Sequence, residues 1–239
     1  MPETARRHFD EDIARAEALA EEGWRHESDG HIRLATDVRS AAIAMSAGAL
    51  DAYLCDAYVD CLARALRAYF RGEWNGALPA FYAKQRLPAG ELLDNSRTIR
   101  PLWSIRMAAR KVMEREDMLN ISRLNDHFNP ILPPDQKIWA DFLPMLFAHR
   151  RKRFTGPLMA EEIAALEGQD RTTAMNTAIA AVKKRLGGII QIRHDWIHNC
   201  GRPRVAIVTY THGEATARVR DIRDFVEGLD DHLETHRFA

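Results

Sequence analysis

Apolar residues recur every three or four positions over long stretches of this chain, and this spacing constrains its fold most strongly. In residues 3–28, one helical face is made of apolar residues: Phe9, Ile13, Ala16, Ala20 and Trp24. Residues 31–71 continue the pattern for roughly 40 positions, longer than an ordinary globular helix, and Gly48 predicts a kink. The sequence therefore predicts two long consecutive helices.

Glycine and proline residues break the pattern between residues 72 and 170. Within that region we expect a helix over 101–118, an irregular connection over 120–134, a helix from Asp135 and a short helix over 159–167. We interpret about 72–170 as an insertion-like middle region.

Helical spacing returns after residue 170. A long helix is predicted over 171–198 and a final helix over 215–235, separated by a β-branched stretch at 205–210 that suits a short extended segment. We find no internal repeat and no second segment with a core of its own. The predicted fold class is all-α: a single domain over residues 1–239, built as a helical bundle with long first helices.

Composition limits the function classes. Lys plus Arg and Asp plus Glu both number 34, so net charge neither favours nor excludes nucleic acid. The three cysteines are an odd number without zinc-type spacing, and the charged first residues do not resemble a signal peptide. No uncharged run approaches the roughly 20 residues of a membrane helix. We therefore expect a cytoplasmic protein with no membrane partner.

An arginine interrupts the apolar face of the helix predicted over 171–198. That face is formed by aliphatic residues: Ile179, Val182, Leu186, Ile189, Ile190 and Ile197. Arg193 falls in its middle, and His194 and His198 lie together along one edge. A guanidinium there must reach water, find an anion, or face a cavity or a partner subunit. Such local contradictions tend to mark function.

Arginine and histidine in this pattern suit chemistry at a phosphate. Arginine can clamp phosphate oxygens and stabilise charge that builds in a transition state, and histidine can transfer protons near neutral pH. With RNA, the substrate's own 2′-hydroxyl can be the nucleophile. Arg193 and His198 would diverge by about 140° on an ideal helix. Either the helix ends between them, as Asn199 and the residues after it allow, or two copies of the segment meet across a dimer.

Arg193, the polar His194 directly after it, and His198 resemble the Arg-x4-His signature of HEPN domains. These form the "higher eukaryote and prokaryote nucleotide-binding" helical superfamily, which includes many metal-independent RNases. The segment Ala-Leu-Asp-Ala-Tyr-Leu at 49–54 resembles the long-helix segment of the RiboL-PSP-HEPN-like branch. The resemblance covers this long helix and everything from about residue 172 onward. The sequence differs in having His194 where asparagine is commoner, and a bulky Trp196 inside the motif.

The resemblance implies roles for individual residues. Arg193 would stabilise the scissile phosphate, His198 would transfer a proton, and His194 would occupy the supporting polar position. It further implies a homodimer in which two motifs converge on RNA, with no cofactor, in a toxin or anti-phage effector that has an antitoxin or regulatory partner. From its position we expect Asp51 to line the cleft or orient the arginine. Asn199 and Arg202 are near enough to support substrate binding.

Two other function classes remain open from the residues alone. One is a non-catalytic HEPN-like module that binds a nucleotide, RNA or a partner protein. The other is a metal-dependent hydrolase, because His194 and His198 have the two-histidine helical spacing of zinc sites, with Cys200 nearby. No glutamate base lies between the two histidines as in metalloprotease helices, so we predict no metal at the site.

Overall fold

A computed structural model shows the arrangement of the chain. It describes residues 3–73, 103–113, 118–133, 137–143, 146, 160–201 and 207–235. Helices account for 83% of these residues and none is in a β-strand, which confirms the all-α fold class. The extended segment predicted over 205–210 is described only from residue 207, and there it has no regular secondary structure.

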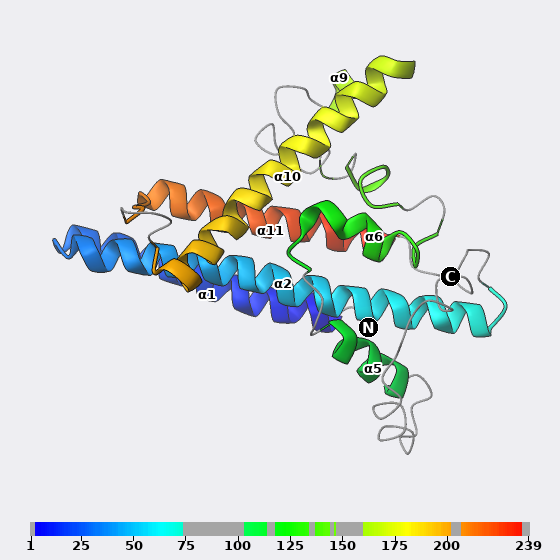
Figure 1. Cartoon of the computed structure of the whole chain (residues 1–239), viewed down its shortest axis with the longest axis horizontal. Coiled ribbons are helices and arrows are strands. Elements are labelled where there is room, and N and C mark those ends of the chain that lie inside the picture. Colours follow the sequence, from blue (N-terminus) through cyan, green and yellow to red (C-terminus); the bar gives the residue numbers. More distant parts are fainter. Residues whose placement is uncertain are drawn as a thin grey trace.

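The first two predicted helices form an antiparallel pair along the length of the shorter one, α1, and α2 continues beyond it (Figure 1). Helix α1 spans Glu3–Ser28 and α2 spans Ile32–Phe70. The expected face of α1 is buried against α2 as far as Ala20, but Trp24 is 51% exposed, so its inclusion in that face was wrong. Helix α2 continues through Gly48 without a break, so the predicted kink is not found.

Helix α11, His212–Thr235, completes a bundle with α1 and α2. Its buried face has the expected 3–4 spacing: Ala215, Val219, Ile222, Val226, Leu229 and Leu233. Two contacts show that α11 is antiparallel to α1. The Trp24 and His212 rings lie 6.2 Å apart at one end, and Arg6 reaches Glu227 at 3.4 Å toward the other.

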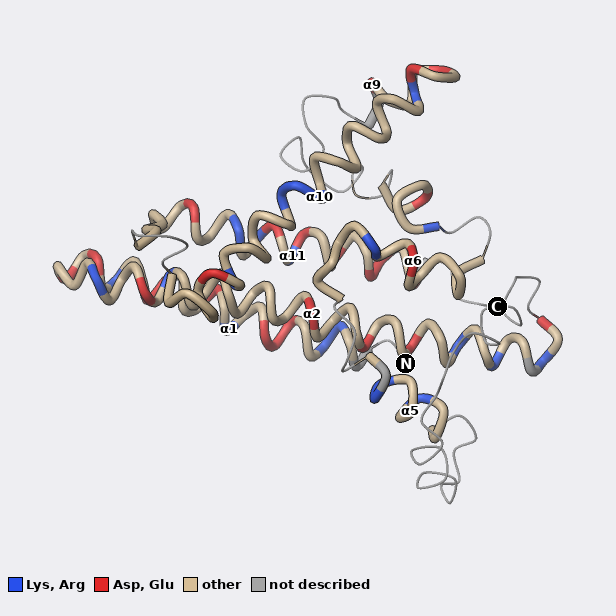
Figure 2. Tube along the Cα trace, in the orientation of Figure 1, with Lys and Arg blue, Asp and Glu red and all other residues tan. Residues whose placement is uncertain are grey.

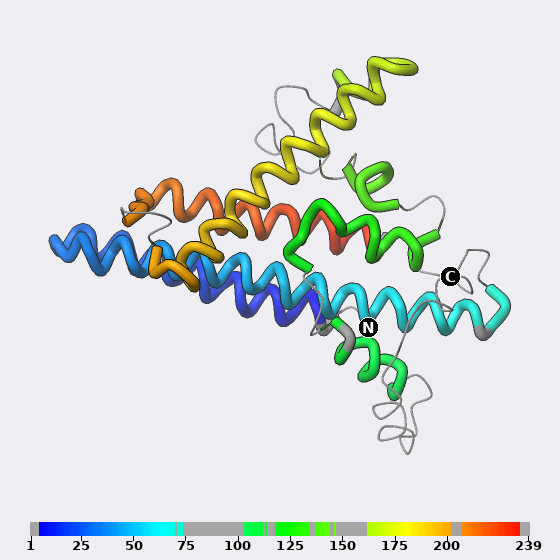
Figure 3. Tube along the Cα trace, viewed as in Figure 1, coloured from blue at the N-terminus to red at the C-terminus, as the bar shows by residue number. Residues whose placement is uncertain are grey.

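Helix α10, Gly168–Asn199, crosses this bundle obliquely and packs mainly on α2 (Figures 1 and 3). It begins three residues before the predicted start and runs unbroken through Gly187 and Gly188. Its N-terminal part lies away from the bundle, next to the short helix α9, Ala160–Ala164. Its buried residues follow one stripe: Ala174, Ala178, Val182, Leu186 and Ile189.

The described part of the middle region packs on α2 and contributes to the same hydrophobic core. Helix α5, Trp103–Met113, docks on α2. The irregular connection expected over 120–134 instead holds two short helices, η1 (Ile121–Arg123) and α6 (Leu124–Phe128). Phe128 and Phe142 are buried in the core shared by α1, α2, α10 and α11. The single-domain organisation and the insertion stay predictions, because many residues of 72–170 lie outside the described part.

Charged residues of both signs occur along the bundle helices, while a basic run lies midway along α10 (Figure 2). This run, Lys183 to Arg185, is engaged in packing. Arg185 forms an ion pair with the buried Asp221 of α11, and Lys183 Nζ lies 5.2 Å from the centre of the Trp139 ring. Of the helices in the described ranges, none has the length and apolar character needed to cross a membrane.

Candidate functional site

The C-terminal turns of α10 carry both residues of the Arg-x4-His motif on one unbroken helix. The helix ends at Asn199, beyond His198. Cys200 then adopts left-handed backbone angles (φ 50°, ψ 41°), and Gly201 follows with φ 72°. The backbone N–H groups of both residues donate to the Asp195 carbonyl, as at many helix C-termini. The expectation that the helix could end between Arg193 and His198 was therefore wrong.

An unbroken helix places the Arg193 and His198 side chains in different directions. Five residues at about 100° each leave them about 140° apart around the α10 axis. His194 lies about 160° around the helix from Ile192, whose side chain packs on the core. Within one chain, the histidines therefore face away from the bundle, and Arg193 lies between the two faces.

The two histidines form a close pair on the surface. His194 and His198 are both exposed, and their ring centroids are 4.6 Å apart with a 46° angle between the planes. This is the contact expected for side chains four residues apart on a helix. The structure therefore brings His194 beside His198, as the sequence predicted for these positions.

Arg193 is half-buried and has no hydrogen-bond or ion-pair partner among the residues that the structure describes. The apolar face on which it was predicted to lie does not reach the helix end, because Ile197 is 49% exposed. Other half-buried arginines pair with carboxylates, such as Arg185 with Asp221 and Arg223 with Glu17. Within the described part of the chain, Arg193 differs from these two in having no carboxylate partner.

Asn199 supports the helix end through a hydrogen bond to Asp195. Its Nδ2 donates to Asp195 Oδ1 at 3.4 Å, and Gln191 Nε2 donates to the same oxygen at 3.0 Å. Asp195 was not among the predicted site residues. Its spacing of four from both Gln191 and Asn199 could have indicated this ladder of hydrogen bonds along one edge of α10.

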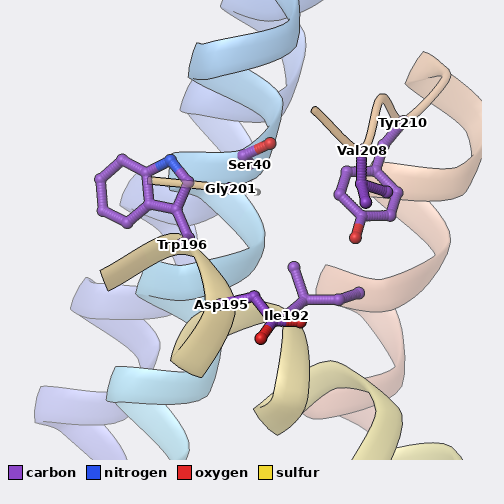
Figure 4. A pocket seen from close by; sticks show the side chains of 7 residues that line it. All are labelled: Ser40, Ile192, Asp195, Trp196, Gly201, Val208 and Tyr210. Carbon is purple, nitrogen blue, oxygen red and sulfur yellow. The ribbon is translucent and has the colours of Figure 1, made fainter. Parts of the chain in front are cut away.

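A small pocket lies between the end of α10, helix α2 and the segment that follows the motif (Figure 4). It is lined by Ser40, Ile192, Asp195, Trp196, Gly201, Val208 and Tyr210. It has room for roughly one water molecule. Neither histidine of the pair lines it. A nucleotide cannot fit inside this pocket. Arg193 and His198 do not line it, and His198 is exposed.

A buried arginine behind this pocket connects the motif end to the first two helices. The side chain of Arg39 is only 4% exposed, forms an ion pair with Glu27, and donates from Nη1 to the Tyr210 carbonyl at 3.2 Å. The hydrogen bond from Arg39 lowers the pKa of Glu27. A Cβ on Gly23 would lie 2.7 Å from Arg39 Cγ, so a glycine is needed where Arg39 passes α1.

Sequence reasoning missed Arg39, although a signal was present. Arg39 lies three and four residues from Ala42 and Ala35, which are both fully buried. It therefore interrupts a small-residue face of α2 in the way that Arg193 was expected to interrupt the face of α10. Arg39 has a carboxylate and a carbonyl partner, so it serves to hold the segment around Tyr210 in place. Burial raises the pKa of the Tyr210 hydroxyl itself.

The remaining predicted site residues are farther away or outside the described ranges. Asp51 is half-buried in α2 and lies eleven positions after Ser40 on the same helix, or about 16.5 Å along the axis. It is therefore not part of the pocket beside Asp195, and its role stays a prediction. Arg202 lies outside the described residues.

Exposed apolar side chains surround the motif. Trp196 and Ile197 on α10, with Ile207 and Val208 just after it, are each between 38% and 49% exposed. Apolar residues that gather on a surface tend to mark contacts with other molecules. In the described ranges, no group of three or more His, Cys, Asp or Glu residues is arranged to hold a metal ion.

No protein-family model, curated protein or solved structure matches this chain. The HEPN resemblance therefore rests on the motif and long-helix residues themselves.

Proposed function

We propose that this chain is a metal-independent endoribonuclease of the HEPN type that acts as a homodimer. The observation that carries the proposal is the surface at the end of α10. An arginine without a partner among the described residues and two exposed, adjacent histidines lie there within six residues. In this proposal the RNA backbone supplies the anion that Arg193 lacks.

In the proposed reaction, the 2′-hydroxyl of RNA attacks the adjacent phosphorus atom. The P–O bond to the 5′-oxygen of the next nucleotide breaks, leaving a 2′,3′-cyclic phosphate and a 5′-hydroxyl. Arg193 stabilises the negative charge on the phosphoryl oxygens. His198 takes part in moving a proton from the attacking 2′-hydroxyl to the departing 5′-oxygen. His194 supports His198, and Asn199 holds Asp195 at the helix end.

The divergence of Arg193 and His198 on α10 supports a site made by two copies. Side chains about 140° apart on one helix cannot converge on one phosphorus atom. In a two-fold symmetric dimer, Arg193 of one copy can approach His198 of the other, because the same surface is used by both. The exposed Trp196 and Ile197 provide an apolar contact for such a dimer.

Cleavage of labelled RNA in excess EDTA tests the activity. We expect the wild type to cleave and leave cyclic-phosphate ends, and Arg193→Ala and His198→Ala each to abolish cleavage while keeping the helical circular dichroism. Arg171→Ala and His31→Ala are matched controls, since both residues are exposed and lie away from the motif. Cleavage at equal rates in all five proteins would refute the assignment of the site.

Mixing the two inactive variants tests whether the site spans two copies. After refolding together, half of the dimers pair Arg193→Ala with His198→Ala, and one of their two sites has an intact arginine and histidine. Recovery of about a quarter of the wild-type activity is expected. If both variants are inactive and the mixture stays inactive, the two groups do not act across the interface.

The alternative is a non-catalytic module that binds a nucleotide, RNA or a partner protein such as an antitoxin. The exposed apolar residues around the motif favour this reading as much as they favour a dimer. It predicts no cleavage by any variant, together with RNA or protein binding that Arg193→Ala weakens. A role in toxin–antitoxin or anti-phage systems is part of the proposal only if the chain cleaves RNA.

A further inference from the structure

The sequence predicted no metal at this position. From the geometry of the histidine pair we nevertheless propose that His194 and His198 form a two-ligand site for a divalent transition-metal ion such as Zn²⁺, and that ion binding there blocks the catalytic histidine. The binding site stands on the geometry of the pair. Its inhibitory effect rests on the proposed nuclease function.

The geometry of the pair suits chelation of one ion. The two rings are exposed, four residues apart on an unbroken helix, with centroids 4.6 Å apart. Zinc binds histidine nitrogen at about 2.0–2.1 Å, and two histidines at this spacing on a helix are a known half of zinc sites. The rings already lie side by side, so a change of side-chain torsions can turn one nitrogen of each toward a common ion.

The surroundings define the class of ion. Imidazole nitrogens suit zinc, copper and nickel, whereas calcium and magnesium prefer oxygen ligands. The nearest carboxylate in sequence, Asp195, is bound by Gln191 and Asn199 along a different edge of α10. It is therefore not poised as a third ligand. No group of three ligand residues is found in the described ranges, so the pair supplies only two positions.

Two further positions of a tetrahedral ion remain to be filled. In a single chain, water would occupy them. In a two-fold dimer that brings the ends of α10 together, the same pair of the second copy could supply them, because an isologous contact repeats each residue. The stoichiometry of binding, one ion per chain or one per two chains, distinguishes these arrangements.

A bound ion would inhibit the proposed reaction for a simple chemical reason. Proton transfer by His198 needs a ring nitrogen with a free lone pair or an exchangeable proton. Coordination occupies that lone pair, so the ring can neither accept nor deliver the proton at that nitrogen. The metal is thus an inhibitor of this site, and its removal restores activity.

Calorimetric titration with Zn²⁺ alone tests the binding, using the wild type, His194→Ala, His198→Ala and His31→Ala. Loss of a mere outer-shell partner costs 10- to 100-fold in metal affinity, so losing either ligand should weaken binding by at least about tenfold. His31→Ala removes a different neighbouring pair, His26 and His31, whose ring centroids are 6.1 Å apart. We expect it to bind Zn²⁺ like the wild type.

Equal affinity in all four proteins, or no binding by the wild type, would overturn the proposed metal site. This readout does not depend on RNA cleavage, so it stands even if the chain is not a nuclease. Where the wild type does cleave RNA, saturating Zn²⁺ should stop cleavage and excess EDTA should restore it. Unchanged cleavage at a Zn²⁺ concentration that saturates the calorimetric site would refute the inhibitory role alone.

Discussion

Large apolar side chains are mostly buried in the bundle of α1, α2 and α11, whereas at the C-terminal end of α10 they are exposed. In the bundle, large apolar side chains such as Phe9 and Phe225 are at most 1% exposed. At the end of α10, Trp196 and Ile197 are 38% and 49% exposed. Most apolar residues of the bundle are therefore buried within one chain, with exposed exceptions at Trp24, Ile32, Leu34 and Tyr69, whereas the end of α10 leaves its large apolar side chains accessible.

Charged residues show the same contrast. Buried charges in the bundle have partners on other helices, as Asp60 has Arg106 and Asp221 has Arg185. Arg193 has none among the described residues. A buried charge without a partner lowers the stability of the fold because it loses its hydration. A half-buried charge at the surface stays partly hydrated and can bind an external anion. The difference indicates that the bundle serves stability and that the end of α10 is available for binding.

The largest expected effect comes from truncating the core. Phe9→Ala removes a ring that packs edge-to-face on Tyr53, with centroids 5.7 Å apart, and should lower the free energy of unfolding by about 3–5 kcal/mol. Trp196→Ala should cost clearly less, about 1–2 kcal/mol, because 38% of this residue is already exposed. Denaturant titration of both variants at low protein concentration measures the difference.

Two results would change this comparison. A cost for Trp196→Ala similar to that of Phe9→Ala would mean that the end of α10 is part of the core. A cost that grows with protein concentration would place Trp196 in an interface between copies, since the stability of a dimer depends on concentration.

Periodicity predicted the long bundle helices because their burial is decided within each helix. The bounds of α1 and α2, and the buried face of α11, follow from apolar residues repeated over six or more turns. Trp24 and Ile197 continue such faces in sequence, but both lie in the last turns of their helices and are exposed. Spacing within a helix cannot show which part of a face is covered by another helix.

The candidate site was predictable only in part for a related reason. The His194–His198 contact is local, at a spacing of four, and the sequence indicated it. The contact between Arg39 and Tyr210 joins residues 171 positions apart, and it depends on how α2 and the segment after α10 meet in three dimensions. Helix α10 ends after Asn199, where Cys200 adopts left-handed backbone angles. Cysteine has no strong preference for that conformation, so the sequence did not show this end.

An intermediate loss in the free energy of unfolding is expected from removing the partner of a buried carboxylate. The side chain of Asp60 is 4% exposed and pairs with Arg106 of α5. Burial raises the pKa of Asp60 above its usual 3.8, and Arg106 opposes that shift. Arg106→Met should cost about 1–3 kcal/mol at neutral pH, less than for a fully buried pair because Arg106 is 32% exposed.

The pH dependence of this cost follows from the direction of the shift. Above its folded-state pKa, Asp60 is charged and needs Arg106. As the pH falls through that raised value, the carboxyl becomes neutral and the cost of Arg106→Met should shrink. Arg110→Met is the matched control, because Arg110 is 55% exposed and its pair with Asp56 should contribute at most about 1 kcal/mol. A cost for Arg106→Met that stays constant down to pH 4 would contradict this account of Asp60.

The smallest effect, a shift in melting temperature, is expected at Glu27, where the bundle meets the segment behind the end of α10. Glu27 accepts a hydrogen bond from Arg39, which holds the Tyr210 segment behind the end of α10, and this bond lowers the pKa of Glu27 below its usual 4.5. A carboxyl with a lowered folded-state pKa stabilises the fold fully above its unfolded-state pKa, and this contribution is lost as the pH falls through the folded-state pKa.

Glu27→Gln keeps an acceptor oxygen but no charge. Its melting temperature should therefore lie slightly below that of the wild type at neutral pH, and the two should converge below pH 4.5. Asp12→Asn, which alters an exposed pair with Arg15, is the matched control and should stay close to the wild type over this range. If the melting temperatures of Glu27→Gln and the wild type differ by the same amount at every pH, the charge of Glu27 does not help Arg39 to hold the Tyr210 segment. Of these two contacts of Arg39, only the hydrogen bond to the Tyr210 carbonyl would then join the bundle to that segment.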